Sequence, residues 1–279
     1  SMIAGWGTGR PLGVAGAGIS TTISVAVAVV LMTVYFRRRE RYVVFDASMV
    51  RPRLSAWKRI LGVGLPPGGE FALMFVYMAI IYWTIRDFGS EAQAGFGVGS
   101  RVMQAVFLPA MAIAFATAPV AGQNVGAGLG DRVRETFRTS MVTLSAIMIL
   151  LTLLCQLRPD VLIAIFTDDQ AVIAVGAEFL SIISWNFVAT GIVFTCSGMF
   201  QAIGNTVPSL VASGTRLVTF ALPAIWLSSQ SWFELRHLWF ASVATVALQA
   251  GFAWWMLSVE MDKKLTVQPP LAVKEVAAV

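Results

Sequence analysis

Seven apolar segments, each near or above the length of a membrane-spanning helix, constrain the fold of this chain more than any other feature. A hydrocarbon core about 30 Å thick needs about 20 helical residues to cross it. The segments are much longer than a barrel strand of about ten residues and lack its polar–apolar alternation, so the sequence predicts helices. We therefore expect an all-α integral membrane protein with about seven transmembrane helices. The segments are Val14–Phe36, Ile60–Ile85, Ala92–Val120, Phe137–Leu157, Val172–Phe200, Leu210–Leu227 and Leu238–Val259.

Charged residues are scarce, and their placement indicates topology. They form 13% of the chain, and hydrophobic residues 57%, against about 25% and 45–50% in soluble domains. The basic residues gather in alternate connections, as in cytoplasmic loops, and form no nucleic-acid-binding patch. We expect the richer set, and with it the C-terminus, in the cytoplasm, and the lipid bilayer rather than nucleic acid as partner. The richer set has thirteen members, Arg37, Arg38, Arg39, Arg41, Arg51, Arg53, Lys58, Arg59, Arg132, Arg134, Arg138, Lys263 and Lys264, and the other has four, Arg10, Arg86, Arg158 and Arg236.

The spacing of the apolar segments predicts four regions. Residues 1–36 hold an N-terminal segment and the first helix. Residues 37–59 form the longest polar connection, which begins with the basic sequence RRRER. We interpret this connection as the link between two modules. Residues 60–259 hold six spans with short connections, which favours one compact bundle. Residues 260–279 are expected to form a disordered cytoplasmic tail, since they contain two adjacent prolines and small residues.

Glu70 is the one carboxylate that we place well inside a span. It lies ten residues beyond Ile60, or about 15 Å along a helix. An unpaired charge at that depth costs at least a few kcal/mol, so we expect Glu70 to be protonated, paired or beside a watery cavity. Pro66 and Pro67 would free backbone carbonyls, which are good cation ligands where they line a cavity. The alternative is that Pro66 starts the helix and Glu70 occupies its first turn near the interface.

Three further polar residues are candidates for an ion-coupling or substrate cavity. Arg101 lies within a span, where it could neutralise Glu70 across a helix pair or extend to the outer headgroups. Asn186 and Thr190 are four residues apart and share one helix face. They could line the cavity, or they could form hydrogen bonds that hold helices together.

The remaining predictions from the residues concern the prolines inside the spans and the enzyme motifs that the sequence lacks. We regard Pro66, Pro67, Pro109, Pro119 and Pro223 as helix-break candidates, because proline weakens the backbone ladder and permits bends. The chain has no phosphate-binding loop, no HExxH motif and no clustered metal ligands. We therefore expect no enzymatic activity, no catalytic residue, no metal centre and no organic cofactor.

Several stretches resemble the multidrug and toxic compound extrusion (MATE) antiporters, in family order and spacing, over most of residues 60–259. The family has twelve spans in two six-span lobes. The resemblance implies that this chain corresponds to the sixth helix and the whole second lobe, without a counterpart to the first five helices. The stretches are Arg101 followed by Pro109 and PVAGQNVGAG, IFTDDQAVIAVGAEFLSI from Ile165, GMFQAIGNTVPS from Gly198, and TRLVTFALPAIWL from Thr215.

The resemblance also implies a function. MATE proteins export cationic or amphipathic compounds by alternating access, driven by inward proton or sodium flow, and bacterial members are multi-pass proteins of the inner membrane. Glu70 resembles a cation-binding carboxylate of the family, which makes it a candidate sodium ligand. A second acidic position of some members corresponds to Thr190 here, which argues against such a sodium site.

Transport would require a first lobe, from a separate chain or from sequence that is missing here. The alternatives are a non-transporting membrane remnant or assembly subunit, and a half-transporter that pairs with itself.

Overall fold

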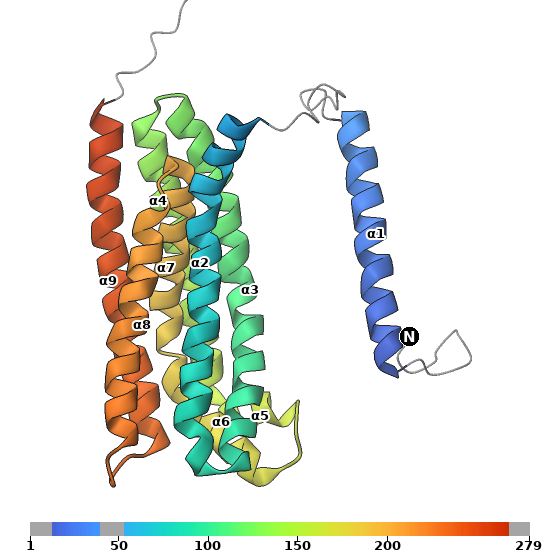
Figure 1. Cartoon of the computed structure of the whole chain (residues 1–279), viewed down its shortest axis with the longest axis vertical. Helices are drawn as coiled ribbons and strands as arrows, with labels where there is room; N and C mark the ends of the chain where they lie inside the picture. The colour runs from blue at the N-terminus through green and yellow to red at the C-terminus, as the bar shows by residue number, and fades with distance from the viewer. Residues whose placement is uncertain (1–12, 40–52, 268–279) are drawn as a thin grey trace, which may run out of the picture. The chain divides into compact units, whose positions relative to one another are not determined.

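The computed structural model describes residues 13–39 and 53–267 and divides the chain into two compact units, residues 1–57 and 58–279 (Figure 1). The first unit contains helix α1 (Gly13–Arg39). Seven helices of the described residues are long and apolar enough to cross a membrane, and these residues include no strand. The predicted all-α membrane fold is therefore confirmed.

Eight further helices and a short 3₁₀ helix follow α1, and every predicted span has a counterpart among the helices. Most helices extend past the predicted span ends, because polar residues continue a helix beyond the apolar run that predicts it. The elements are α2 (Leu54–Ile85), η2 (Arg86–Phe88), α3 (Ser90–Gly126), α4 (Gly130–Leu157), α5 (Pro159–Ala164), α6 (Gln170–Ile183), α7 (Asn186–Ile203), α8 (Val207–Ser228) and α9 (Leu235–Val267).

The predicted span Val172–Phe200 is a helix in two pieces, α6 and α7, separated only by Ser184 and Trp185. Around them the backbone forms tighter bonds, from Trp185 N to Ile182 O at 3.3 Å and from Phe187 N to Ser184 O at 3.1 Å. Helix α4 supports this point, since the Thr152 hydroxyl donates to Ser184 O at 3.0 Å. A short 3₁₀ stretch inside a helix is a common position for a hinge.

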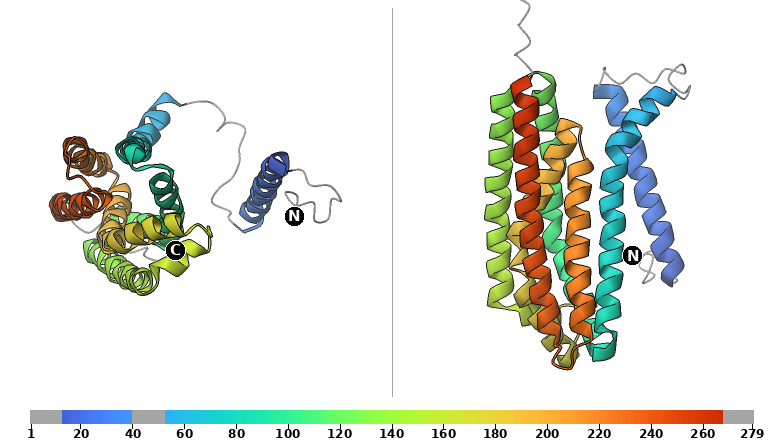
Figure 2. Two further views of the ribbon diagram at one scale, coloured as in Figure 1. Left: turned by 90° about the horizontal axis from the view of Figure 1, so that it is seen from below. Right: turned by 60° about the vertical axis from the view of Figure 1, so that its left-hand side comes forward.

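Helices α3, α7 and α9 form the centre of the second unit. Helix α3 packs against α4, α6 and α7, and α9 packs against α6, α7 and α8. Glycines allow the closest approaches: a Cβ built on Gly198 would lie 2.7 Å from the Ala114 carbonyl oxygen, and one on Gly95 would lie 3.0 Å from Gly176 N. Small residues at such crossings are typical of membrane helix bundles. Figure 2 shows the bundle along its axis and from the side.

Helix α2 is packed differently from the other long helices of this unit. No helix among the described residues runs along α2 at close backbone distance. Instead α2 is joined to α8 and α9 mainly through side chains: the Tyr77 and Phe220 rings are 4.6 Å apart, and the Tyr77 hydroxyl lies 2.7 Å from Ser242 Oγ. The space between α2 and these helices holds the polar cavity described below.

The five helix-break candidates lie within helices that continue past them, Pro66 and Pro67 inside α2, Pro109 and Pro119 inside α3, and Pro223 inside α8. One prediction about a helix end is wrong. The tail does not leave the helix at Glu260, because α9 continues to Val267. There the Asn205 amide donates to Glu260 Oε1 at 3.0 Å and the Lys264 ammonium to Ile203 O at 2.7 Å, which ties this turn to the end of α7. Residues 40–52 and 268–279, within the predicted connection and tail, lie outside the described residues.

Candidate functional site

Glu70 lies in the middle of helix α2. It follows Leu54, the first residue of the helix, by 16 positions, or about 24 Å of helix. Pro66 therefore does not start the helix, and Glu70 does not occupy its first turn. The Ser197 and Ser209 hydroxyls, from α7 and α8, lie beside the carboxyl group. Its Oε1 atom is buried and has no hydrogen-bond partner among residues 13–39 and 53–267.

A cavity of about 70 Å³ opens between α2, α8 and α9. A volume of this size holds only a few water molecules. Two of its acceptor atoms, Glu70 Oε1 and Gln249 Oε1, are buried and unpartnered in the described part of the chain. The Gln249 amide nitrogen donates to Ser213 Oγ at 3.2 Å, which fixes the orientation of the amide oxygen. The cavity is lined by Glu70, Leu73, Met74, Tyr77, Ser213, Arg216, Leu217 and Gln249.

Arg216 of α8 brings a positive charge into this cavity. Its guanidinium carbon lies 4.4 Å from the centre of the Tyr77 ring, a distance at which the ring face attracts the cation. Its Nε atom is buried and donates to no acceptor that the structure describes. The cavity therefore contains one carboxylate, one guanidinium, two unpartnered acceptors and one unpartnered donor.

A hydrogen-bonded chain connects the cavity to the break between α6 and α7. The Tyr77 hydroxyl pairs with Ser242 Oγ, and the Asn186 amide nitrogen reaches the same oxygen at 3.5 Å. Asn186 is the first residue of α7 and is 3% exposed. The structure thus links the predicted site residue Asn186 to Tyr77, which lines the cavity of Glu70.

The carbonyl oxygens that the paired prolines free are not all available to a cation. Pro67 has no N–H to offer the Val63 carbonyl, four residues earlier. The Thr206 hydroxyl at the start of α8 donates to that oxygen at 2.9 Å instead. A side chain of a neighbouring helix therefore replaces the lost helical bond, and α2 continues through Pro66 and Pro67.

The two other predicted site residues lie away from the cavity. Arg101 is exposed on α3, and no ion pair joins it to Glu70 in the described chain. Thr190 is half-buried on α7 and does not line the cavity. The structure therefore links Asn186 through Ser242 to Tyr77, which lines the Glu70 cavity, and brings neither Arg101 nor Thr190 to that cavity.

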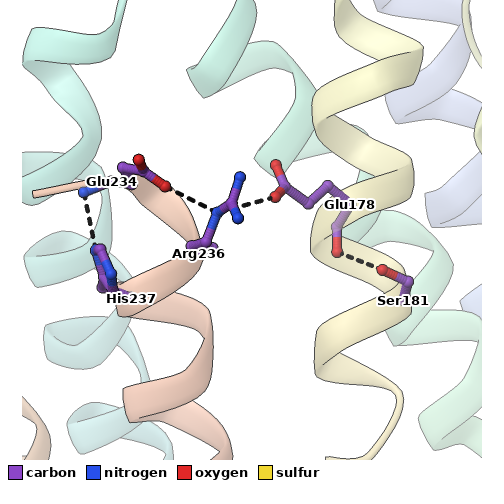
Figure 3. A network of polar contacts seen from close by, with 5 residues as sticks. All are labelled: Glu178, Ser181, Glu234, Arg236 and His237. Carbon is purple, nitrogen blue, oxygen red and sulfur yellow. Dashed lines mark hydrogen bonds and ion pairs between the residues drawn. The ribbon is translucent and has the colours of Figure 1, made fainter.

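Two further polar regions lie elsewhere in the same unit. An open groove of about 530 Å³ between α3 and α4 is lined in part by Asn124, Arg132 and Glu135. Near the start of α9, Arg236 Nε lies 2.8 Å from Glu234 Oε2 and 3.8 Å from Glu178 Oε1 of α6 (Figure 3). These charges are exposed, and surface ion pairs of this kind contribute about 0–1 kcal/mol.

Arg216, Ser213 and Gln249 were not predicted as site residues. Ser209, Ser213 and Arg216 recur at intervals of four and three residues, which places them on one face of α8. A polar face on an otherwise apolar span indicates an interior position. This spacing was a usable signal for the cavity, and α9 carries a similar one, since Ser242, Thr245 and Gln249 recur at intervals of three and four residues.

Comparisons with known proteins agree with this architecture. The model of the MatE family matches residues 66–227. The "Probable multidrug resistance protein NorM" of Thermotoga maritima is 27% identical over 241 residues, which cover 86% of this chain and 52% of that protein. The "Multidrug export protein MepA" of Staphylococcus haemolyticus is 23% identical over 197 residues, covering 71% of this chain and 43% of that protein.

Solved structures show the same fold. A MOP superfamily transporter from Pyrococcus furiosus matches with a TM-score of 0.85 at 22% identity, over 94% of this chain and 59% of that chain. An outward-facing MATE family multidrug resistance transporter also gives 0.85 at 22% identity, over 94% and 58%. The chain spans about half the length of the curated relatives it matches. Because the family model covers more than half of the residues, the chain belongs to the MatE family of membrane transporters.

Proposed function

We propose that this chain forms the second lobe of a cation-coupled multidrug efflux antiporter that works by alternating access, with Glu70 as the coupling carboxylate. The observation that carries the proposal is the position of Glu70 halfway along a span, beside an internal cavity and with an unpartnered oxygen. Carboxylates at such positions usually belong to ion pathways, because a charge there is costly to keep without a role.

The coupling follows from competition for one charge. A carboxylate in a small cavity cannot satisfy a coupling ion and a cationic cargo independently, so binding of one weakens binding of the other. If the ion enters from outside and the cargo from inside, this competition exchanges one for the other. The relatives are named as multidrug resistance and export proteins, which supports organic cations and amphipathic compounds as cargo.

The complete transporter would need a further set of helices. Arg101 supports this inference, since it is exposed on α3 eleven residues after Ser90, about 16 Å into the helix. A charged side chain at that depth normally faces protein or water rather than lipid. We propose that a first lobe, from a separate chain or from a second copy, covers this face, and that the assembly lies in the bacterial inner membrane.

Efflux of a fluorescent cation such as ethidium tests the proposal. The measurement uses cells that contain the chain together with a MATE first lobe, and compares the wild type, Glu70→Gln and Glu91→Gln. Glu70→Gln should reduce gradient-driven efflux to the background of cells without the chain, because the neutral amide cannot exchange ions. Glu91→Gln removes an exposed carboxylate in the first turn of α3 and should retain efflux. Efflux by Glu70→Gln at the wild-type rate, at equal membrane abundance, would exclude the coupling role.

A further inference from the structure

We infer that Arg216 is a built-in cation that takes the place of sodium in the Glu70 cavity, so that this site excludes sodium. The inference deepens the proposed function, on which it rests for the role of Glu70 as the ion-binding carboxylate. It concerns which ion the cavity accepts and which residue determines that choice.

The donor set of the cavity initially resembles a sodium site. Glu70 Oε1 and Gln249 Oε1 are buried acceptors without partners in the described residues, and oxygen atoms are the ligands that hard cations prefer. The guanidinium of Arg216 lines the same cavity of about 70 Å³, however, and its Nε donor is also unpartnered. One unpartnered donor and two unpartnered acceptors share a space that holds only a few water molecules.

Charge and geometry therefore both disfavour sodium. The positive charge of Arg216 already balances the single carboxylate, and a sodium ion would add a second positive charge to the same small cavity. Arginine remains protonated in proteins, so this charge is permanent. The Val63 carbonyl oxygen, which the prolines might have offered to a cation, accepts the Thr206 hydroxyl. No group of three or more histidine, cysteine or acidic side chains that could hold a metal ion occurs in the described ranges.

Stacking on Tyr77 keeps the guanidinium in the cavity. The 4.4 Å distance to the ring centre gives a cation–π contact, and Tyr77 itself is positioned by its hydrogen bond to Ser242. The flexible side chain of Arg216 can turn its donors toward Glu70 or Gln249 without leaving the cavity. The arginine can thus supply both the charge and the hydrogen bonds that a bound sodium ion would supply.

Binding of ²²Na⁺ to the purified 279-residue chain tests the inference without any transport step. The wild-type protein should show no saturable sodium binding that depends on Glu70. Arg216→Gln removes the charge but leaves both acceptors, and it should raise sodium affinity by about tenfold or more. Tenfold is the lower limit, because it is the size expected for one charge roughly 10 Å away at an effective dielectric constant of about 20, and Arg216 lines the same small cavity. The double variant Glu70→Gln with Arg216→Gln should lose the gain.

Two controls separate the charge of Arg216 from its shape and from general effects. Arg216→Lys keeps a positive charge and should remain without sodium binding. Arg101→Gln removes an exposed arginine that does not line the cavity and should not gain binding. Gel filtration and thermal unfolding establish that each variant is folded.

Either of two results overturns the inference: Glu70-dependent sodium binding by the wild type, or a folded Arg216→Gln variant without any gain. The wild-type measurement decides the first point even if the variant fails to fold. Failure of the proposed function would look different, since Glu70→Gln would then keep efflux whatever the binding experiment shows.

Discussion

At the scale of single residues, the bundle interior depends on polar side chains that replace lost backbone hydrogen bonds. Pro67 removes the donor for the Val63 carbonyl, and Thr206 of another helix supplies a new one at 2.9 Å. Thr152 gives Ser184 O a second donor, beside the Phe187 N–H, at the break between α6 and α7. In a membrane these bonds matter because water is not available to replace them.

Replacing Thr206 with valine should therefore destabilise the protein by about 1 kcal/mol, the usual net contribution of a hydrogen bond. The substitution keeps the side-chain shape but leaves the Val63 carbonyl without its donor. Thr215→Val is the matched control, because the exposed Thr215 hydroxyl bonds only to Val211 O of its own helix. Thermal unfolding in detergent should show a lower midpoint for Thr206→Val, by roughly 2–4 °C. Equal midpoints for the two variants would contradict the role assigned to Thr206.

The sequence predicted part of the candidate site correctly, and its failures have a physical reason. Glu70 could be found because a carboxylate in an apolar span is rare. One of the two roles considered for Arg101, pairing with Glu70, does not occur, since position along a span does not determine which face of the helix a residue occupies. Gln249 is a site residue only because α2, α8 and α9 together line the cavity. Which helices line a cavity depends on tertiary packing, and we could not derive that packing from one sequence.

At the scale of helices, the crossing of α3 and α7 depends on the absence of a side chain. A Cβ on Gly198 would lie 2.7 Å from the carbonyl oxygen of Ala114, a distance that real Cβ atoms essentially never show. Backbone atoms cannot rotate away as a flexible side chain can. The two helices would therefore have to separate to accommodate any larger residue.

Gly198→Ala should therefore destabilise the bundle by about 1–3 kcal/mol, the typical effect of overpacking. Gly214→Ala serves as control, because nothing lies within 4 Å of a Cβ built there and alanine favours the helix. The thermal midpoint in detergent should fall for Gly198→Ala and stay level or rise for Gly214→Ala. A stable Gly198→Ala variant would show that α3 and α7 do not cross as closely as described.

Helix positions were predictable and helix interruptions were not. Apolar runs of membrane length identified every span, because crossing a hydrocarbon core requires that length. The interruption at Ser184 and Trp185 contains no proline or glycine and is held from outside by Thr152 of α4. The five prolines that suggested breaks lie in helices that continue. Breaks here depend on bonds between helices, so composition along one helix does not reveal them.

At the scale of the whole molecule, seven helices long and apolar enough to cross a membrane predict that the two ends of the chain lie on opposite sides. The excess of lysine and arginine in one set of connections predicts that the C-terminus is cytoplasmic. Helix α9 ends near the α7–α8 connection, where Lys264 donates to Ile203 O. The start of α4, which carries Arg132 and Arg134, belongs to the same predicted side.

Reporter fusions test this orientation. Green fluorescent protein placed after Val279 should fluoresce, because it folds in the cytoplasm, whereas alkaline phosphatase at the same position should remain inactive. A phosphatase fusion in the connection between α8 and α9 should be active and provides the control for the assay. The opposite result at the C-terminus would reverse the orientation and the direction of the proposed exchange.

Helix α2 contacts its neighbours mainly through side chains rather than by close backbone packing. This spacing also makes the lobe a target for inhibitors. A small molecule that reached both Glu70 and Gln249 would act as a wedge and lock α2 in one position. Because α2 lacks close backbone packing with the other described helices, few contacts would resist such a wedge. Under the proposed function, a compound of this kind would block export by immobilising α2, independently of the chemistry of the exported drug.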